Sequence, residues 1–120
     1  EVPREQTTSV VRSYERHNLS ISSEFIQYSL LDNFEPNAFN VYIYDIFPNT
    51  QMEEDSVVFS HLAMEFLFVL EGSLTLIVQN EEHILNPYDG MKVMPHIDHR
   101  WYNHTNKICK CIVILQDISK

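Results

Sequence analysis

The sequence predicts an all-β fold, a barrel or a sandwich, preceded by a short polar arm. From Phe25 onward, short runs rich in Val, Ile, Tyr and Phe recur at near-even spacing, which is typical of such folds. Asn, Asp, Pro and Gly separate the runs, and no stretch after Glu24 repeats apolar residues with the spacing of an amphipathic helix. The length of 120 residues is sufficient for one hydrophobic core.

The polar N-terminal segment differs in amino-acid composition from the rest of the chain. We expect an arm or linker over residues 1–24, with a short helix near Val10 to Tyr14, and one folded domain over residues 25–120. Nine runs within that domain are predicted strands: Phe25–Leu31, Phe39–Phe47, Val57–His61, Glu65–Glu71, Ser73–Gln79, His83–Leu85, Met91–Met94, Arg100–Asn103 and Cys109–Gln116.

Turn-forming residues fall where these strands must end. Pro48-Asn49 closes one strand, Asn80-Glu81 can turn a hairpin, and Pro87-Tyr88-Asp89-Gly90 forms a second turn. Gly72 and Gly90 are the only 2 glycines of the chain, and each lies between two apolar runs. At both we expect either a positive φ angle or a close approach of another part of the chain.

The charge and the cysteines exclude several classes of function. A formal charge of -9 repels phosphate backbones and anionic membranes, so we expect no nucleic-acid contact by this chain itself. No apolar run approaches the roughly 20 residues that span a bilayer. Cys109 and Cys111 would lie on one face of a strand about 6.6 Å apart, an awkward span for a disulfide. Two reduced thiols suit a reducing compartment, most simply the cytoplasm.

Two segments carry a recognisable motif spacing. The stretch from Phe59 to Gly72 contains His61, then Glu65, and ends in an apolar run closed by glycine. The stretch from Tyr88 to Asn103 contains a turn, a proline, His99 and a final asparagine. These segments resemble the first and second motifs of the cupin superfamily.

The resemblance extends from Asn40 to Leu115 and implies a cupin double-stranded β-helix, which is a jelly-roll barrel. It also implies that His61, Glu65 and His99 converge inside the barrel. Two imidazoles and one carboxylate can hold a divalent metal such as Fe, Mn, Ni or Zn with open coordination positions. The chain departs from the family pattern at Phe59, which occupies the place of the first motif histidine.

Three roles remain open for this group of residues. It could bind one divalent metal, it could line a metal-free ligand pocket, or it could be a self-satisfied structural cluster. The predicted ligand contacts are Phe59, His61, Glu65, Met94, His99 and Trp101, and the predicted metal ligands are His61, Glu65 and His99. Trp101 and Asn103 share strand parity with His99, so we expect them to face the same interior.

The layout of a polar arm followed by a cupin resembles the C-terminal sensor domain of Xre-type helix-turn-helix transcriptional regulators. That resemblance implies a small-molecule effector, with DNA bound by a separate helix-turn-helix domain upstream. A metal-dependent dioxygenase, isomerase or lyase is the alternative, although the Phe59 substitution disfavours it. A third possibility is a purely structural dimerisation domain. Phe66, Phe68 and Leu70 alternate with Leu67 and Val69, so both faces of this strand are apolar and the outer face needs cover. The N-terminal segment could cover it, but we expect a homodimer in which a partner's sheet does so.

Overall fold

A computed structural model describes residues 10–16, 18–31, 39–53, 63–95 and 97–117 of the chain. Its elements, in chain order, are the short 3-10 helix η1 (Ser13–Glu15) and the strands β1 (Asn18–Ile21), β2 (Phe25–Ser29), β3 (Phe39–Ile46), β4 (Thr50–Glu53), β5 (Ala63–Glu71), β6 (Leu74–Val78), β7 (Glu81–Leu85), β8 (Gly90–Val93), β9 (His99–Asn103) and β10 (Cys109–Asp117). None of the described residues forms a helix that is long and apolar enough to cross a bilayer.

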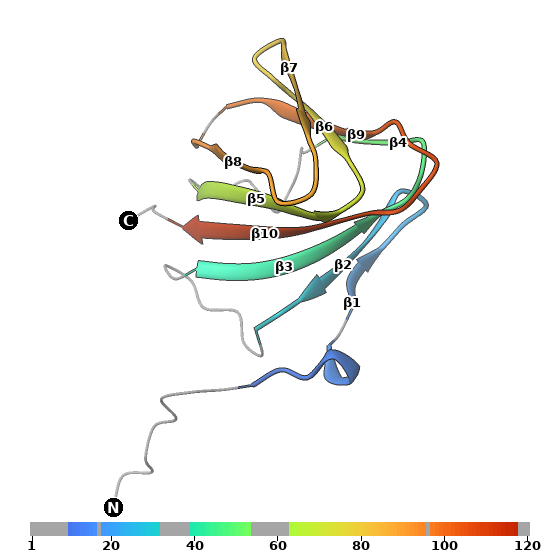
Figure 1. Ribbon diagram of the computed structural model, residues 1–120. Coiled ribbons are helices and arrows are strands. Elements are labelled where there is room, and N and C mark those ends of the chain that lie inside the picture. Colours follow the sequence, from blue (N-terminus) through green and yellow to red (C-terminus); the bar gives the residue numbers. More distant parts are fainter. Residues whose placement is uncertain (1–9, 17, 32–38, 54–62, 96, 118–120) are drawn as a thin grey trace, which may run out of the picture.

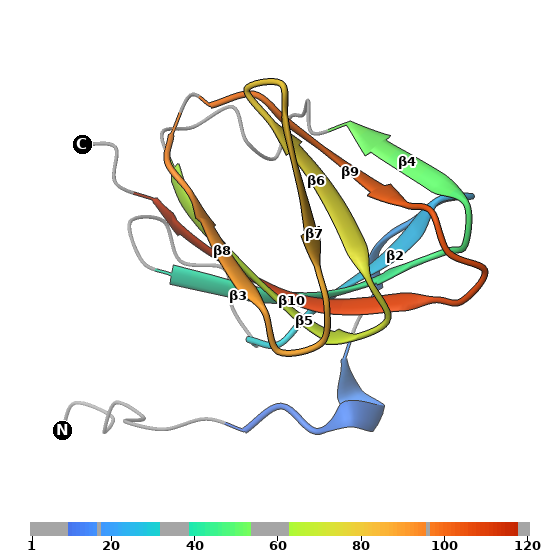
Figure 2. The same cartoon turned by 45° about the horizontal axis from the view of Figure 1, so that its top comes forward.

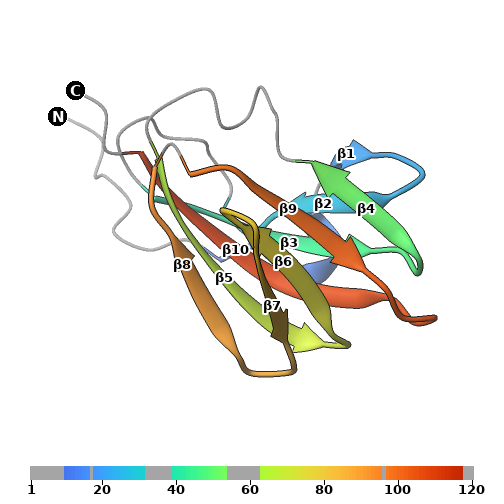
Figure 3. The same cartoon turned by 90° about the horizontal axis from the view of Figure 1, so that it is seen from above.

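The strands form two facing antiparallel sheets. A six-stranded sheet has the order β1-β2-β3-β10-β5-β8, and a four-stranded sheet has the order β4-β9-β6-β7. Figure 1 shows the larger sheet below the smaller one, and Figure 2 shows β9, β6 and β7 in front of it. Seen from above, β9 ends and β10 begins on the same side of the molecule, where a short loop joins them (Figure 3). This arrangement confirms the predicted jelly-roll barrel.

Strict alternation of side chains explains how the central strands form. In β3, the residues Asn40, Tyr42, Tyr44 and Ile46 are buried, while the residues between them are less buried. Successive side chains of a strand point to opposite faces, so β3 presents one face to the barrel interior. β10 lies between β3 and β5 and repeats the pattern, with both of its cysteines fully buried.

The core fills the space between the two sheets. Trp101 on β9 packs edge-on against Tyr44 on β3, with 5.2 Å between the ring centroids, so one aromatic contact joins the sheets. The largest fully buried side chains are Trp101, Ile46, Leu67, Leu74, Leu76, Val69, Val113, Asn103, Cys109 and Cys111. The buried polar residues of the described chain are Gln27, Asn40, Glu65, Thr75 and Asn103.

Both glycines have the roles expected of them. Gly72 adopts a φ of 82°, and a Cβ atom there would lie 3.0 Å from the Cys109 Cα atom. Gly90 lies under the ring of Phe66, which would be 2.8 Å from a Cβ atom. The hairpin between β6 and β7 turns at Gln79 and Asn80, with φ angles of 52° and 67°, one residue earlier than predicted.

Two strands were not predicted. β1 lies within the segment expected to be an arm, and it pairs with β2 at the edge of the larger sheet. β4 pairs with β9 at the edge of the smaller sheet. The predicted strand Val57–His61 lies outside the described residues. The expected helix near Val10 to Tyr14 is a single 3-10 turn, Ser13–Glu15, and the domain boundary at residue 25 stays a prediction.

Candidate functional site

Glu65 and His99 meet inside the barrel from opposite sheets. Glu65 lies on the inner face of β5, and His99 is the first residue of β9. The distance between His99 Nε2 and Glu65 Oε1 is 2.8 Å. The His99 side chain is only 10% exposed and the Glu65 side chain only 4%, so this is a buried contact between two ionisable groups. Two of the three predicted metal ligands are therefore brought together.

The hydrogen bonds of His99 fix where its protons lie. His99 Nδ1 is 2.9 Å from the backbone carbonyl oxygen of Ile97. A carbonyl oxygen only accepts, so Nδ1 must carry a proton. One further proton then lies between Nε2 and Glu65 Oε1, either on the ring or on the carboxyl group.

Two polar atoms of the barrel interior lack partners among the described residues. Glu65 Oε2 and Trp101 Nε1 are buried, and neither has a hydrogen-bond partner among the described residues. A buried polar group without a partner costs about 1–3 kcal/mol. Such atoms in a native fold indicate a missing partner, which can be water, an ion or a ligand. Next to His99, Glu65 therefore has one carboxylate oxygen that is free to accept a hydrogen bond in the described part of the chain.

Asn40 is a further buried polar residue on the inner face of the larger sheet, and no motif in the sequence points to it. Leu115 on β10 pairs with Asn40 on one side and with Glu65 on the other, so all three share the inner face. Asn40 is 7% exposed. Two strand spacings separate the Cα atoms of Asn40 and Glu65 by about 10 Å. Burial raises the pKa of Tyr42, two residues along the same face, so its phenol stays protonated.

The remaining predicted contacts are placed less completely. Trp101 is buried two residues after His99 on the same face of β9. Met94 follows β8 and is 50% exposed. Phe59 and His61 lie outside the described residues. Their roles in binding stay predictions.

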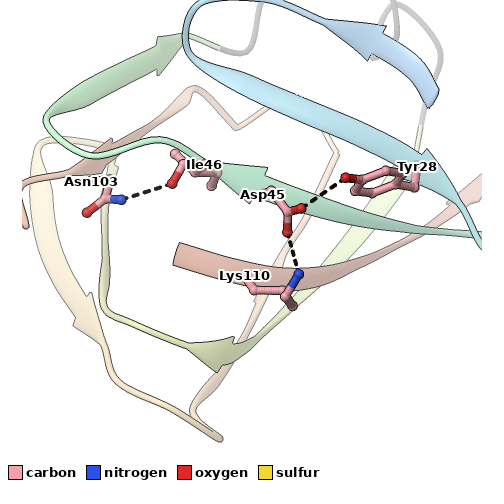
Figure 4. Close-up of polar contacts among 5 residues, drawn as sticks. All are labelled: Tyr28, Asp45, Ile46, Asn103 and Lys110. Atoms are coloured by element: carbon pink, nitrogen blue, oxygen red, sulfur yellow. Dashed lines mark hydrogen bonds and ion pairs between the residues drawn. The ribbon is translucent and has the colours of Figure 1, made fainter. Parts of the chain in front are cut away.

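Asn103 faces the interior as expected, and its side chain holds neighbouring backbone segments together by hydrogen bonds. Its side-chain nitrogen donates to the carbonyl oxygens of Ile46, Phe47 and Lys107 at 3.0, 3.1 and 2.8 Å. Its side-chain oxygen accepts from the Thr105 backbone N–H and hydroxyl. Figure 4 shows the bond to Ile46 beside the outer contacts of Asp45. Every hydrogen-bonding position of Asn103 is therefore used.

The residues present fit a divalent cation in part. An imidazole nitrogen and a carboxylate are ligands that such cations accept. Among the described residues, however, no group of three or more His, Cys, Asp or Glu side chains gathers at one place. Glu65 and His99 would supply two ligands, and a bound metal would provide Lewis-acid chemistry there.

The fold is shared with solved structures at low sequence identity. The cupin domain of an XRE family transcriptional regulator from Enterobacter cloacae superposes with a TM-score of 0.71 and 15% identity, covering 81% of this chain and 100% of that one. An RmlC-like cupin from Shewanella frigidimarina NCIMB 400 superposes with a TM-score of 0.74 and 14% sequence identity. This match covers 98% of this chain and 97% of that one. Hydroxypropylphosphonic acid epoxidase from S. wedmorenis superposes with a TM-score of 0.74 and 19% sequence identity. This match covers 89% of this chain and 58% of that one.

No curated protein sequence is significantly similar to this chain. The family profile described as "Cupin domain" matches residues 50–115. That segment contains β4 to β9 and most of β10, and it includes Glu65, His99 and Trp101. It covers more than half of the 120 residues. The chain therefore belongs to the cupin domain family, as its motif spacing predicted.

Proposed function

We propose that this chain is the effector-binding cupin domain of a transcriptional regulator, and that it binds a small molecule inside the barrel next to Glu65 and His99. The observation that supports this proposal is the buried Glu65 carboxylate. Its Oε1 contacts His99, while its Oε2 has no partner in the described chain. A ligand that completes this carboxylate gains a buried hydrogen bond at little reorganisation cost.

The regulator assignment draws on the similarity to the cupin domain of an XRE family regulator, which this chain covers over that domain's full length. The net charge of -9 is consistent with a sensor that leaves DNA contacts to a basic partner domain. Effector binding would shift the position of β9 relative to β5, because His99 and Glu65 join the two sheets.

Thermal unfolding with a panel of small molecules tests the binding function. A ligand at 100 times its Kd stabilises a protein by about 2.7 kcal/mol, which raises the Tm of a domain this size by several degrees. We expect such a compound to stabilise the wild type and Glu71→Gln, an exposed control on the same strand, but not Glu65→Gln. If no compound shifts the Tm, the binding function is wrong.

The regulatory role needs a separate test on the full-length gene product. We expect a helix-turn-helix segment upstream of the cupin, and an operator affinity that changes when the stabilising compound is added. A full-length product without any DNA-binding segment would contradict the regulatory role, while leaving the binding function standing.

A metal-dependent enzyme is the second candidate function. The contact between an imidazole and a carboxylate favours it, and so does the structural similarity to an epoxidase. Elemental analysis of the purified chain tests this alternative. About one divalent metal per chain, lost in a His99→Ala variant and retained in His104→Ala, would support the enzyme. Absence of metal after purification and reconstitution would contradict it.

We further propose that the domain is a homodimer. The outer face of the larger sheet carries a continuous set of apolar side chains, named here the outer apolar face: Val41, Ile43, Phe66, Phe68, Ile112 and Ile114. Phe66 is 39% exposed in the single chain. A partner sheet packed on this surface would remove it from water.

A further inference from the structure

We propose that an aromatic cluster at one edge of the outer apolar face anchors the contact with a second copy of this chain, and that Tyr88 is the central residue of this contact. The cluster consists of Phe66, Phe68 and Tyr88 and is named here the aromatic edge. This inference rests on the proposed homodimer and says which part of the surface holds the two copies together.

Tyr88 has a backbone conformation that is costly for its side chain. Its φ angle is 74°, in the left-handed region, where glycine and asparagine are tolerated but a bulky side chain is rare. A residue held in that region persists only where other interactions offset the strain. Tyr88 is 74% exposed, so burial within the single chain offsets little of it. A partner that covers the ring would supply the missing stabilisation.

The turn that carries Tyr88 is fastened to β5. The Tyr88 backbone N–H donates to the Val69 carbonyl oxygen at 2.7 Å, and the Val69 N–H donates to the Asp89 carbonyl oxygen at 3.1 Å. The Asp89 side chain also accepts from the Asn86 backbone N–H at 2.8 Å. The centroid of the Tyr88 ring lies 5.9 Å from that of Phe68. The position of the ring is thus set before a partner arrives, which lowers the entropy cost of binding.

Gly90 allows a further ring to lie at this edge. A Cβ atom at position 90 would be 2.8 Å from the end of the Phe66 ring, so the ring occupies space that a side chain on β8 would need. Phe68 is the register partner of Gly90, and it lies two residues from Phe66 on the same face of β5. The three rings therefore form one exposed aromatic surface. Aromatic side chains are enriched among the residues that dominate binding at protein interfaces.

The charges beside the outer apolar face favour a second copy of the chain as the partner. The chain has 17 acidic residues against 8 basic ones, so on average its surface repels another copy. The border of the outer apolar face, in contrast, includes charges of both signs: Arg16, Lys92, Lys110, Asp45 and Glu71. A two-fold axis places this border against itself, so basic side chains of one copy can meet acidic side chains of the other.

Sedimentation of Tyr88→Asn tests the inference. Asparagine tolerates a positive φ angle but lacks the ring, so we expect the Kd of the dimer to rise by about tenfold or more. Tyr88→Phe keeps the ring and should dimerise like the wild type. Gln79→Asn is the matched control, because Gln79 is exposed and has a φ of 52° but lies in the turn after β6, on the smaller sheet. Its Kd should equal that of the wild type.

Thermal unfolding below the Kd of the dimer separates binding from folding. There, Tyr88→Asn should leave the Tm unchanged or raise it by a few degrees, because strain is removed and little burial is lost. A lower Tm would show that the ring stabilises the single chain, and would overturn the inference. A wild-type dimer whose Kd is unchanged in Tyr88→Asn would also overturn it, while leaving the homodimer standing. A wild type that never dimerises would instead contradict the homodimer itself.

Discussion

At the scale of single residues, the Glu65–His99 contact sets both the stability and the chemistry of the interior. The tautomer of His99 is fixed by the Ile97 carbonyl, so Nε2 must either donate to a carboxylate or accept from a carboxylic acid. Removing one partner leaves the other buried and unsatisfied, a change that typically costs more than the pair itself contributes.

Substitution of Glu65 should therefore depend strongly on the replacement. Glu65→Ala is expected to lower the free energy of unfolding by about 3 kcal/mol, because it leaves His99 Nε2 buried without the carboxylate that it contacts. Glu65→Gln should cost about 1 kcal/mol, because its amide can donate to Nε2 of the neutral ring. Urea unfolding measures both, with exposed Glu71→Ala as the control. Equal losses for Ala and Gln would show that the hydrogen bond to His99 does not matter.

The two buried thiols give a prediction at high pH. Burial, aided by Asp45, raises the pKa of Cys109 to about 12, and burial also raises the pKa of Cys111 well above its ordinary value. Above an ordinary thiol pKa of about 8.5, the unfolded chain loses these protons while the folded chain keeps them. The free energy of unfolding should then fall with rising pH by about 1.4 kcal/mol per unit for each thiol.

A Cys109→Ala/Cys111→Ala double variant isolates this effect. Its unfolding free energy, measured in urea between about pH 8.5 and pH 10.5, should fall less steeply than that of the wild type, because the two thiols no longer titrate. Tyrosines and lysines titrate in both proteins, so the difference between the two curves reports the cysteines. Parallel curves would mean that the thiols are not protected by the fold.

At the scale of elements, Asn103 joins the end of β9 to the end of β3 and closes the loop before β10. We expect Asn103→Asp to lower the free energy of unfolding by about 3 kcal/mol, because a carboxylate cannot donate to the three carbonyl oxygens that it would face. The matched change Asn106→Asp, in the same loop and exposed, should cost less than about 0.5 kcal/mol. Urea unfolding of the two variants compares them, and similar losses would contradict this role.

The predictability of each strand follows from its place in its sheet. β3, β5 and β10 bury one face and carry apolar side chains on much of the other, so each appears in the sequence as a run rich in Val, Ile, Leu, Phe and Tyr. β4 is an edge strand with the sequence Thr-Gln-Met-Glu, and it forms by backbone pairing with β9. Backbone pairing leaves no mark in side-chain periodicity, so β4 and the edge strand β1 could not be predicted in this way.

The same reasoning separates the predicted part of the site from the missed part. The motif spacing identified Glu65 and His99, and strand parity placed Trp101 on the same face of β9 as His99. Asn40 has the parity of Tyr42 and Tyr44 within a predicted strand, and a polar residue on a buried face was the available signal. Its nearness to Glu65 depends on the register of β10 against both β3 and β5, which no local pattern encodes.

At the scale of the whole molecule, the larger sheet is apolar on both sides. Across its outer surface, Ile114 pairs with Phe66 on one neighbour and Val41 on the other, and Ile112 pairs likewise with Phe68 and Ile43. Asp45 and Lys110 form an ion pair of 2.7 Å at one end of this surface (Figure 4), where Tyr28 also donates to Asp45. An apolar centre with polar residues at its edge is typical of protein interfaces.

A charge placed in the centre of the outer apolar face should separate the proposed dimer. Ile114→Lys would bury an unpaired ammonium group at the interface, so we expect the variant to sediment as a monomer at concentrations where the wild type is a dimer. Ile84→Lys is the control, since Ile84 is 61% exposed on the other sheet and lies outside the proposed interface. The Tm of the wild type should also rise with protein concentration, and that of Ile114→Lys should not, because only association couples stability to concentration. A wild-type chain that sediments as a monomer at every concentration would show that the outer apolar face is not a homodimer interface.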